Sequence, residues 1–294
     1  MTPSCLVSPA ADLTFRMCLP DSEEPSVRAL RTGRYPQTLG ALFSLLRTLM
    51  PAPAKVLDLG GYLGGFGLAA AAAGHEVTIV EANTENARWI RRSIEQNTFP
   101  RRVTLVEGAV GETDGPVNFL PNGPWGHVQR KETSTNVACV SMMTLPTLLA
   151  SLGWTTPDFI KMDVEGSEGG VLRGADAWFA SGHRPVILYE ANGHTLQWFG
   201  DSPLTLRRFL AVRGYHQYEL QEDGLLRVPS GFEPRVLVDY LASPVPLPGV
   251  LPARSAWKVL RRTAAALRRN SWPARRHVVR ALRDTFGSQR VARR

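Results

Sequence analysis

The sequence predicts an α/β fold: a doubly wound, mostly parallel sheet with an antiparallel edge strand, followed by a basic helical C-terminal tail. Three observations predict it. Short apolar, β-branched runs alternate with amphipathic helical patterns through most of the chain. A glycine-rich turn directly follows the first buried run of the core, and Lys and Arg gather beyond residue 250. The alternation is typical of β-α-β units, and the basic end of the chain predicts a separate element.

The expected elements follow one another in the order that such a sheet requires. A short strand at 13–19 and a helix at 36–49 precede the first core strand at 54–59. The other parallel strands are expected at 75–80, 102–107, 159–162 and 185–189, with helices at 66–73, 83–97, from 167 onward and at 204–213. Two further strands, at 215–220 and 225–228, flank a Glu-Asp-Gly turn that favours a hairpin, so we expect an antiparallel strand at the edge.

Three parts are expected along the chain. Residues 1–50 supply an N-terminal strand and helix that pack on the core, and residues 51–242 form the main domain. Residues 243–294 comprise a Pro-rich linker and the basic amphipathic tail. Within the main domain, residues 108–144 are rich in Gly, Pro, Asn and Thr and are expected to be irregular. A long irregular stretch in a compact domain is typical of a functional loop.

The charge of the chain is unevenly distributed. The net charge is +8, but the residues from Leu251 onward hold thirteen Lys and Arg and one acid, so the remainder sums to −4. Two basic amphipathic helices are expected there, at 255–269 and 273–286, and they suit an anionic membrane surface or an acidic partner. Alternatively, they dock on the acidic body or stay solvated. Nucleic acid is not expected as the substrate, because the body lacks a basic, aromatic-lined surface.

The cysteines indicate the compartment. The three are far apart and form no CxxC motif or Cys/His cluster, which argues against a disulfide framework or a zinc site. The apolar content of 44% is ordinary for a globular protein, and no apolar run is long enough to span a bilayer. We therefore expect a cytoplasmic protein, peripheral at the membrane if the tail binds there.

The glycine-rich turn after the first core strand predicts a site for a positively charged cofactor. Its pattern is Asp58-x-Gly60-x-x-x-Gly64, and glycines at the carboxyl end of a strand let a ligand approach the backbone. A dinucleotide is the main competitor, but the GxGxxA match at 65–70 starts too far beyond the strand, and Asp58 would repel a pyrophosphate. S-adenosylmethionine lacks phosphate and carries an ammonium and a sulfonium. We expect Asp58, Gly60, Gly61 and Gly64 to bind it.

Glu81 adds a second cofactor residue. It ends the second core strand, 23 residues after Asp58, where an acid can accept both hydroxyls of a ribose. Nicotinamide cofactors use an acid in the same way, so an NAD(P)-dependent oxidoreductase remains an alternative on this residue alone. A phosphate-binding P-loop is excluded, because no Gly-Lys-Ser/Thr follows the turn.

A second charged group follows the fourth core strand, in the sequence KMDVEGSE at 161–168. The carboxyl edge of the sheet brings this group beside the first turn. Methyl transfer to oxygen requires an aligned acceptor and removal of its hydroxyl proton. Asp163 and Glu165 are candidates for the base or for hydrogen bonds to the acceptor, and Lys161 for polarising it. No metal is expected, although Asp163, Glu165 and Glu190 could hold a divalent cation through their oxygens.

Structural roles are the alternative for several of these residues. Lys161 could simply pair with a neighbouring acid, and Ser167 or Glu168 could cap the next helix. His194 closely follows the fifth strand and is a further candidate base. The segment 118–140 is expected to shape the acceptor pocket.

The chain resembles the FkbM methyltransferase family from about residue 13 to about residue 192. The resemblance rests on VLDLG at 56–60, Gly64, Val80-Glu81, EGAVG at 107–111, Glu190 and, above all, KMDVEGSE at 161–168 with VLRGA at 171–175. It implies a Rossmann-like methyltransferase fold and usually O-methylation, often of sugar or natural-product hydroxyls. It also implies that the cofactor is held by Asp58, Gly60, Gly64 and Glu81, and we add Ala109 from the third-strand motif.

Two positions depart from the family pattern. Tyr62 stands where Asn is frequent, and Ala82 stands where Pro often follows the strand-end acid. Taken together, the residues predict an S-adenosylmethionine-dependent O-methyltransferase for a small-molecule or carbohydrate-like hydroxyl. The alternatives are a non-catalytic, membrane-associated Rossmann-like module and an NAD(P)-dependent oxidoreductase.

Overall fold

The computed structural model describes residues 4–129, 137–221, 224–228 and 237–247. All of them belong to one unit of the chain, which ends at Val250. The two predicted tail helices lie outside the described residues, as do the first two residues of the predicted Glu-Asp-Gly turn. Among the described residues, no helix combines the length and the apolar character that crossing a membrane requires.

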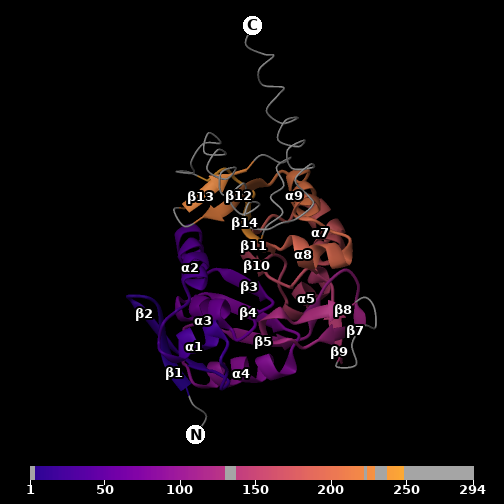
Figure 1. The fold of residues 1–294 in the computed structure, drawn as a ribbon. Helices are drawn as coiled ribbons and strands as arrows, with labels where there is room; N and C mark the ends of the chain where they lie inside the picture. Colours follow the sequence, from indigo (N-terminus) through magenta and orange to yellow (C-terminus); the bar gives the residue numbers. More distant parts are fainter. Residues whose placement is uncertain (1–3, 130–136, 222–223, 229–236, 248–294) are drawn as a thin grey trace, which may run out of the picture. The chain divides into compact units, whose positions relative to one another are not determined.

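An eight-stranded sheet organises the described part of the chain (Figure 1). Its parallel-paired strands are β3 (Lys55–Leu59), β4 (Glu76–Glu81), β5 (Val103–Glu107), β10 (Phe159–Met162) and β11 (Val186–Ala191). They lie in the order β5-β4-β3-β10-β11, so the strand order reverses between β3 and β10, as in a doubly wound sheet. The predicted fold class of the body is therefore confirmed.

Three more strands extend the sheet beyond β11: β14 (Val238–Ser243), β12 (His216–Gln221) and β13 (Gly224–Arg227). The hairpin of β12 and β13 is where the sequence predicts it, and β13 is the antiparallel edge strand. The sequence pattern predicts no strand at β14, which nevertheless pairs antiparallel with both β11 and β12. Nearly every residue of β14 is buried, so the strand lacks the polar alternation that marks a half-exposed strand.

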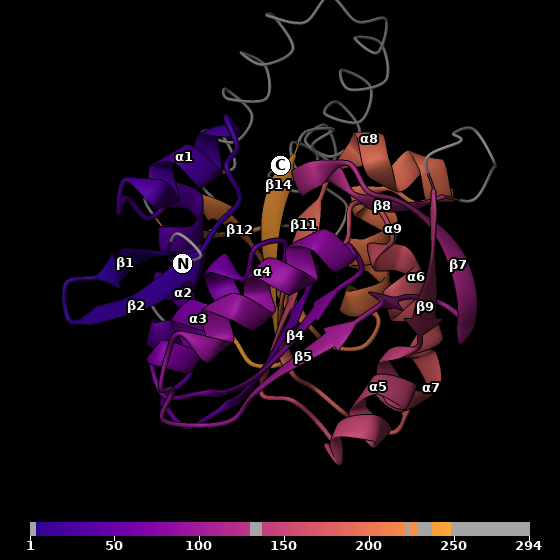
Figure 2. The ribbon, with the colours of Figure 1, turned by 90° about the horizontal axis from the view of Figure 1, so that it is seen from below.

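Each face of the sheet is covered by its own helices (Figure 2). Successive strand residues point to opposite faces, and Val56 and Leu57 of β3 belong to two separate apolar cores. Val56 packs with residues of α2 (Gln37–Leu49), α3 (Gly65–Ala72) and α4 (Thr84–Glu95). Leu57 packs with residues of α5 (Leu145–Leu152), α6 (Glu168–Gly174), α7 (Asp176–Ala180) and α9 (Pro203–Ala211). These two cores hold the carboxyl ends of the parallel strands in place.

The residues before the core form a hairpin and two helices. β1 (Ser4–Ala10) and β2 (Leu13–Cys18) pair in a separate antiparallel sheet, and α1 (Pro25–Arg31) precedes α2. The sequence pattern predicts β2 and α2 but neither β1, which contains Pro and Ser, nor α1, which has seven residues. Cys18 links β2 to α4, because its N–H donates to Ser93 Oγ at 2.9 Å.

The described residues of the stretch 108–144 are largely regular, so the expectation of an irregular stretch is wrong for them. Its described residues include a four-stranded sheet in the order β6-β9-β7-β8. The strands are β6 (Ala109–Val110), β7 (Gly115–Leu120), β8 (His127–Gln129) and β9 (Ala138–Met143). Strands of two to six residues show little periodicity, and the Gly and Pro residues among them resemble loop sequence. This small sheet supplies one wall of the candidate active site.

Candidate active site

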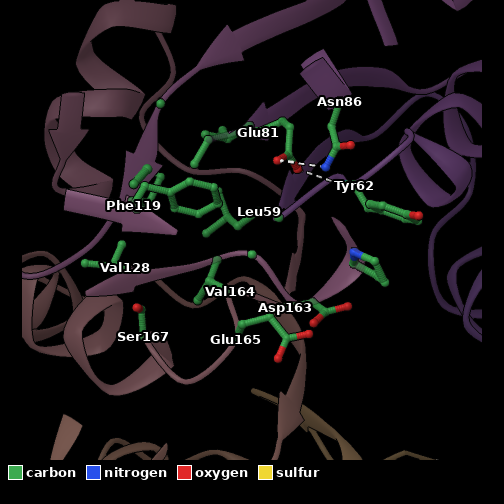
Figure 3. Close-up of a pocket in the computed structure, with 18 of the residues that line it drawn as sticks. Leu59, Tyr62, Glu81, Asn86, Phe119, Val128, Asp163, Val164, Glu165 and Ser167 are labelled. Carbon is green, nitrogen blue, oxygen red and sulfur yellow. Dashed lines mark hydrogen bonds between the residues drawn. The ribbon is translucent and has the colours of Figure 1, made fainter. Parts of the chain in front are cut away.

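An open cavity lies at the carboxyl ends of β3, β4 and β10, with about 640 Å³ of empty space that includes part of the open solvent (Figure 3). The lining is polar toward Tyr62, Glu81 and the turn after β10, and apolar toward the small sheet. The polar residues are Tyr62, Glu81, Asn86, Asp163, Glu165 and Ser167, and the larger apolar ones are Leu59, Val80, Val110, Phe119, Val128 and Val164.

Gly60 lies where the turn after β3 comes very close to the turn after β10, and only a residue without a side chain fits there. Its φ is +77°, and a Cβ placed on it would lie 1.8 Å from the backbone oxygen of Asp163. The Asp163 N–H also donates to the Leu59 carbonyl at 3.0 Å, so the turns after β3 and β10 are in direct contact. Gly60 lines the cavity, whereas Gly61 packs on Ile79 and is not part of the lining. The glycine therefore serves the contact between strands as well as any approach of a ligand.

Gly64 and Tyr62 shape the rest of the turn. Gly64 has a φ of +84° and caps the start of α3, outside the lining of the cavity. Tyr62 has a φ of +51°, which is uncommon for a residue other than glycine. Its N–H donates to Glu81 Oε2 at 2.7 Å, so the turn after β3 is bonded to the end of β4.

Glu81 lines the cavity and is 6% exposed. Its carboxylate accepts the N–H groups of Tyr62 and Asn83 at 2.7 and 2.8 Å, and the Asn86 side chain lies 3.5 Å away (Figure 3). Burial raises the pKa of Glu81 to about 7, although these donors oppose the shift. A carboxylate has about four lone-pair sites, so Glu81 keeps capacity for ribose hydroxyls.

Asp58 and Lys161 form a buried ion pair behind the cavity. The two residues are register partners on β3 and β10, and Lys161 Nζ lies 3.3 Å from Asp58 Oδ1. The Gly67 N–H donates to Asp58 Oδ2 at 3.0 Å. Burial raises the pKa of Asp58, and the charge of Lys161 opposes that shift. Neither side chain is among the residues that line the cavity.

Lys161 also reaches the second acidic group. Its Nζ lies 3.2 Å from Asp163 Oδ2 and 3.4 Å from the Gly60 carbonyl oxygen. Burial alone would lower the pKa of Lys161, but the charges of Asp163 and Asp58 raise it above its ordinary value. Lys161 therefore remains a cation that joins both turns, which corresponds to the ion-pairing alternative considered from the sequence.

Asp163 and Glu165 line the cavity, and two further acids lie close to them. Burial and the charge of Asp163 raise the pKa of Glu165 to about 7. Burial and the charges of Asp163 and Glu165 raise the pKa of Glu190, near the end of β11, to about 9. Asp239 lies opposite Glu190 on β14, and burial, followed by the charge of Asp163, raises its pKa to about 6. Glu165, Glu190 and Asp239 therefore hold their protons to higher pH than ordinary carboxyl groups do.

The other predicted residues fall on both sides of the cavity wall. Ala109 lines the cavity. Glu168 is buried, and its Oε1 accepts the Val164 N–H at 3.0 Å, so it stabilises the turn that precedes α6. Ser167, the N-cap residue of α6, makes no capping hydrogen bond with its side chain. His194, on the short helix α8 (Gly193–Leu196), is not part of the lining.

Several lining residues lie outside the sequence motifs, although the segment 118–140, which is expected to shape the pocket, does contribute to the lining. Phe119 and Val128 come from β7 and β8, within the stretch that appears irregular in sequence, and Asn86 lies on α4. Ser167 is 4% exposed, and its Oγ has no hydrogen-bond partner. Figure 3 shows it at the end of the cavity where Val128 also lies. Its position after Gly166 in the KMDVEGSE motif was the available clue.

These features define a Rossmann-like enzyme whose acid-lined cavity lies where such sheets bind their ligands. The family model described as the FkbM methyltransferase domain matches residues 65–216, more than half of the chain. The chain belongs to the FkbM methyltransferase family, as the resemblance predicts, and its cofactor is S-adenosylmethionine. The match begins one residue after Gly64 and includes the KMDVEGSE motif.

Solved structures with similar folds are distant in sequence. A SAM-dependent methyltransferase from Agrobacterium tumefaciens is 16% identical, with 83% of this chain and 71% of that chain covered and a TM-score of 0.45. A magnesium protoporphyrin IX methyltransferase from Synechocystis PCC 6803 is 12% identical, with 76% and 85% covered and a TM-score of 0.45. No curated protein matches the chain.

The residues present fit S-adenosylmethionine. Glu81, Asp163 and Glu165 face the cavity and suit a ligand with two positive charges. The apolar side chains of Val80, Phe119 and neighbouring residues suit a flat adenine ring. Among the lining residues that the structure describes there is no Lys or Arg, which suits a cofactor without phosphate.

Proposed function

We propose that this chain transfers the methyl group of S-adenosylmethionine to a hydroxyl oxygen of a small-molecule or carbohydrate-like acceptor. The observation that carries the proposal is that Asp163 and Glu165 line the same cavity as the cofactor residue Glu81. A hydroxyl is a poor nucleophile until its proton is removed, and a carboxylate in reach of it can accept that proton. Two carboxylates can also hold neighbouring hydroxyls of a polyol.

The chain's own residues then have separate tasks. The cofactor supplies a methyl group on a positively charged sulfur, which becomes a neutral thioether when the methyl leaves. Glu81 holds the ribose, and Glu165, whose pKa of about 7 suits a base near neutral pH, accepts the hydroxyl proton. Asp163 orients the acceptor, and Lys161 fixes the position of Asp163. Phe119 and Val128 exclude water from the apolar end.

The identity of the methylated atom tests the proposal. The full chain is incubated with S-adenosylmethionine carrying a ¹³C-labelled methyl group and with sugars, polyols and phenols. Amines of matched size serve as the control acceptors. We expect ¹³C resonances of O-methyl products from the hydroxyl acceptors alone. N-methyl or C-methyl products in place of O-methyl products would contradict the proposal. Calorimetry with S-adenosylhomocysteine, the demethylated form of the cofactor, verifies that the protein used can bind it.

We further propose that residues 251–294 bring a cytoplasmic enzyme to an anionic membrane surface. The support is their charge, with thirteen basic residues and one acid. Co-sedimentation with vesicles containing anionic lipid, compared with neutral vesicles, tests this proposal. We expect binding to the anionic vesicles that is lost in a chain ending at residue 250 and weakened by salt. Equal sedimentation of both chains would contradict it.

A further inference from the structure

Three carboxylates meet where β10 and β11 end. Asp163 and Glu165 follow β10, and Glu190 lies near the end of β11. One oxygen from each of the three lies within 4.8 Å of the others. All three residues are half-buried, and Figure 3 shows the carboxylates of Asp163 and Glu165 side by side at one end of the cavity. The group is therefore compact and adjacent to the site of methyl transfer.

The negative charge of this group is not balanced within the described part of the chain. Lys161 is the one cation that pairs with it there, and its Nζ is shared between Asp58 and Asp163 at 3.3 and 3.2 Å. The side-chain carboxylates of Glu165 and Glu190 make no hydrogen bond or ion pair with another described residue. Asp239 lies directly opposite Glu190 in the antiparallel pairing of β11 and β14. When both carboxyls are ionised, like charges in that position are destabilising, and a bound cation would offset them.

Glu168 provides an independent indication of a ligand. It is 1% exposed, and it interacts electrostatically with both Asp163 and Glu190. Its Oε1 accepts the Val164 N–H, but its Oε2 is buried and has no hydrogen-bond partner. Burying a carboxylate oxygen without a partner costs free energy, and such an atom is commonly explained by a bound water or ion.

The spacing of the three oxygens suits a hard divalent cation. Such ions prefer oxygen ligands, with bonds of about 2.0–2.1 Å for Mg²⁺ and about 2.3–2.6 Å for Ca²⁺. Ligand oxygens on opposite sides of one ion are therefore about 4–5 Å apart. The three oxygens lie within 4.8 Å of one another, which does not exceed that range.

We propose that Asp163, Glu165 and Glu190 together bind one hard divalent cation at the edge of the active-site cavity. The catalytic part of this inference rests on the proposed O-methyl transfer, whereas the binding of the cation does not. The acceptor hydroxyl becomes a further ligand, and the cation lowers its pKa. The proton leaves to solvent, the oxygen forms the bond to the methyl carbon, and the electron pair of the broken carbon–sulfur bond stays on sulfur. In this arrangement Glu165 is a ligand of the cation, and it does not also act as the base described for the reaction without a cation.

Binding of Mn²⁺ by the full chain, followed by electron paramagnetic resonance, tests the site directly. The titration is made with metal-free protein, with and without S-adenosylhomocysteine. The variant is Glu190→Gln, and the matched control is Glu76→Gln, which removes one carboxylate from the opposite edge of the sheet, at the start of β4. We expect one Mn²⁺ per chain for the wild type and the control, and at least tenfold weaker binding for Glu190→Gln. Because Gln removes a charge opposite Asp239, the variant is expected to be folded, and circular dichroism verifies this.

Two results would overturn the cation site: no bound Mn²⁺ at about 1 mM free ion, the weak end of protein sites for such cations, or equal affinity in Glu190→Gln and the wild type. The two proposals fail separately. Mn²⁺ bound by wild-type protein that forms no O-methyl product leaves the cation site standing and removes the proposed function. If O-methyl product forms at full rate in the presence of a chelator and the protein binds no Mn²⁺, the proposed function stands and the cation site is removed.

Discussion

The two acidic groups at the carboxyl edge of the sheet differ in how their charge is balanced. Asp58 is fully buried and has Lys161 Nζ at 3.3 Å and the Gly67 N–H at 3.0 Å. Glu165 and Glu190 are half-buried, and neither carboxylate forms a hydrogen bond or ion pair with any described residue. The first group is satisfied within the protein, whereas the second requires a proton, a cation or a ligand.

This difference distinguishes a residue of the sequence motif, Asp58, from the residues that contact a ligand. From the sequence, Asp58 is the residue expected to attract a cationic cofactor. In the structure Lys161 offsets its charge, and the Asp58 side chain holds β3 against α3 and β10 from behind the cavity. The carboxylates that line the cavity are those of Glu81, Asp163 and Glu165, and they provide the electrostatic attraction at the cavity itself.

The largest effect is expected from breaking the satisfied pair. Lys161→Met leaves Asp58 buried without its cation, and removing one partner of a buried pair costs about 3–5 kcal/mol. The measurement is the free energy of unfolding in urea. The double variant Asp58→Asn with Lys161→Met should recover much of the loss, because no unpaired charge is then buried. Equal stability of Lys161→Met and the wild type would show that the pair does not stabilise the fold.

The contact between the two turns is tested by Gly60→Ala. The new Cβ would meet the Asp163 carbonyl oxygen at 1.8 Å, and the positive φ adds backbone strain, for a loss of about 3 kcal/mol. Gly200→Ala is the matched control, because its φ is +78° and nothing lies within 4 Å of an added Cβ. We expect the control to lose only about 1 kcal/mol, from backbone strain alone. Similar losses in both variants would mean that the turns are not held in close contact.

The unbalanced group is expected to affect turnover more than stability. Glu165→Gln removes either the base or a cation ligand, and kcat should fall about 100-fold, equivalent to about 2.7 kcal/mol. The affinity for S-adenosylhomocysteine should change less than the rate, as calorimetry on the same samples would show. Glu76→Gln again serves as the control, with unchanged kcat. A Glu165→Gln variant with wild-type turnover would remove Glu165 from the chemistry.

The fold of the core and part of the site follow from local sequence. The strands β3, β4 and β10 are compact apolar runs ended by Gly or acidic residues, which mark both the strand and its carboxyl edge. The sequence also brings Glu81, Asp163 and Glu165 to one edge, because parallel strands end on the same side. These inferences need only the period of the strand and the direction of the chain.

What the sequence does not show depends on contacts between distant segments. Asp239 lies on β14, a strand buried on both faces that inserts between β11 and β12, so its position opposite Glu190 has no local signal. Phe119 and Val128 lie on strands too short for a visible period. The pairing of Asp58 with Lys161 follows from the register of β3 against β10, which neither strand specifies alone.

The smallest effect concerns Glu81, which combines the two kinds of environment: it is buried and hydrogen-bonded, yet it faces the cavity. Its folded-state pKa of about 7 lies above the ordinary 4.5, so the protonated form stabilises the fold. That contribution is complete below pH 4.5 and is lost as the pH rises through about 7. Ribose hydroxyls donate to the ionised form, so cofactor binding requires the proton to leave.

Affinity for S-adenosylhomocysteine should therefore be about tenfold weaker at pH 6 than at pH 8, as calorimetry at both pH values would measure. Glu165, whose pKa is also raised to about 7, titrates in the same range, so the comparison that matters is with Glu81→Gln. This variant should bind more weakly at pH 8 and lose most of the pH dependence, because the neutral amide has no proton to release. If Glu81→Gln keeps the full tenfold change, the pH dependence arises from the carboxylates beyond β10, and the unbalanced group controls cofactor binding as well as turnover.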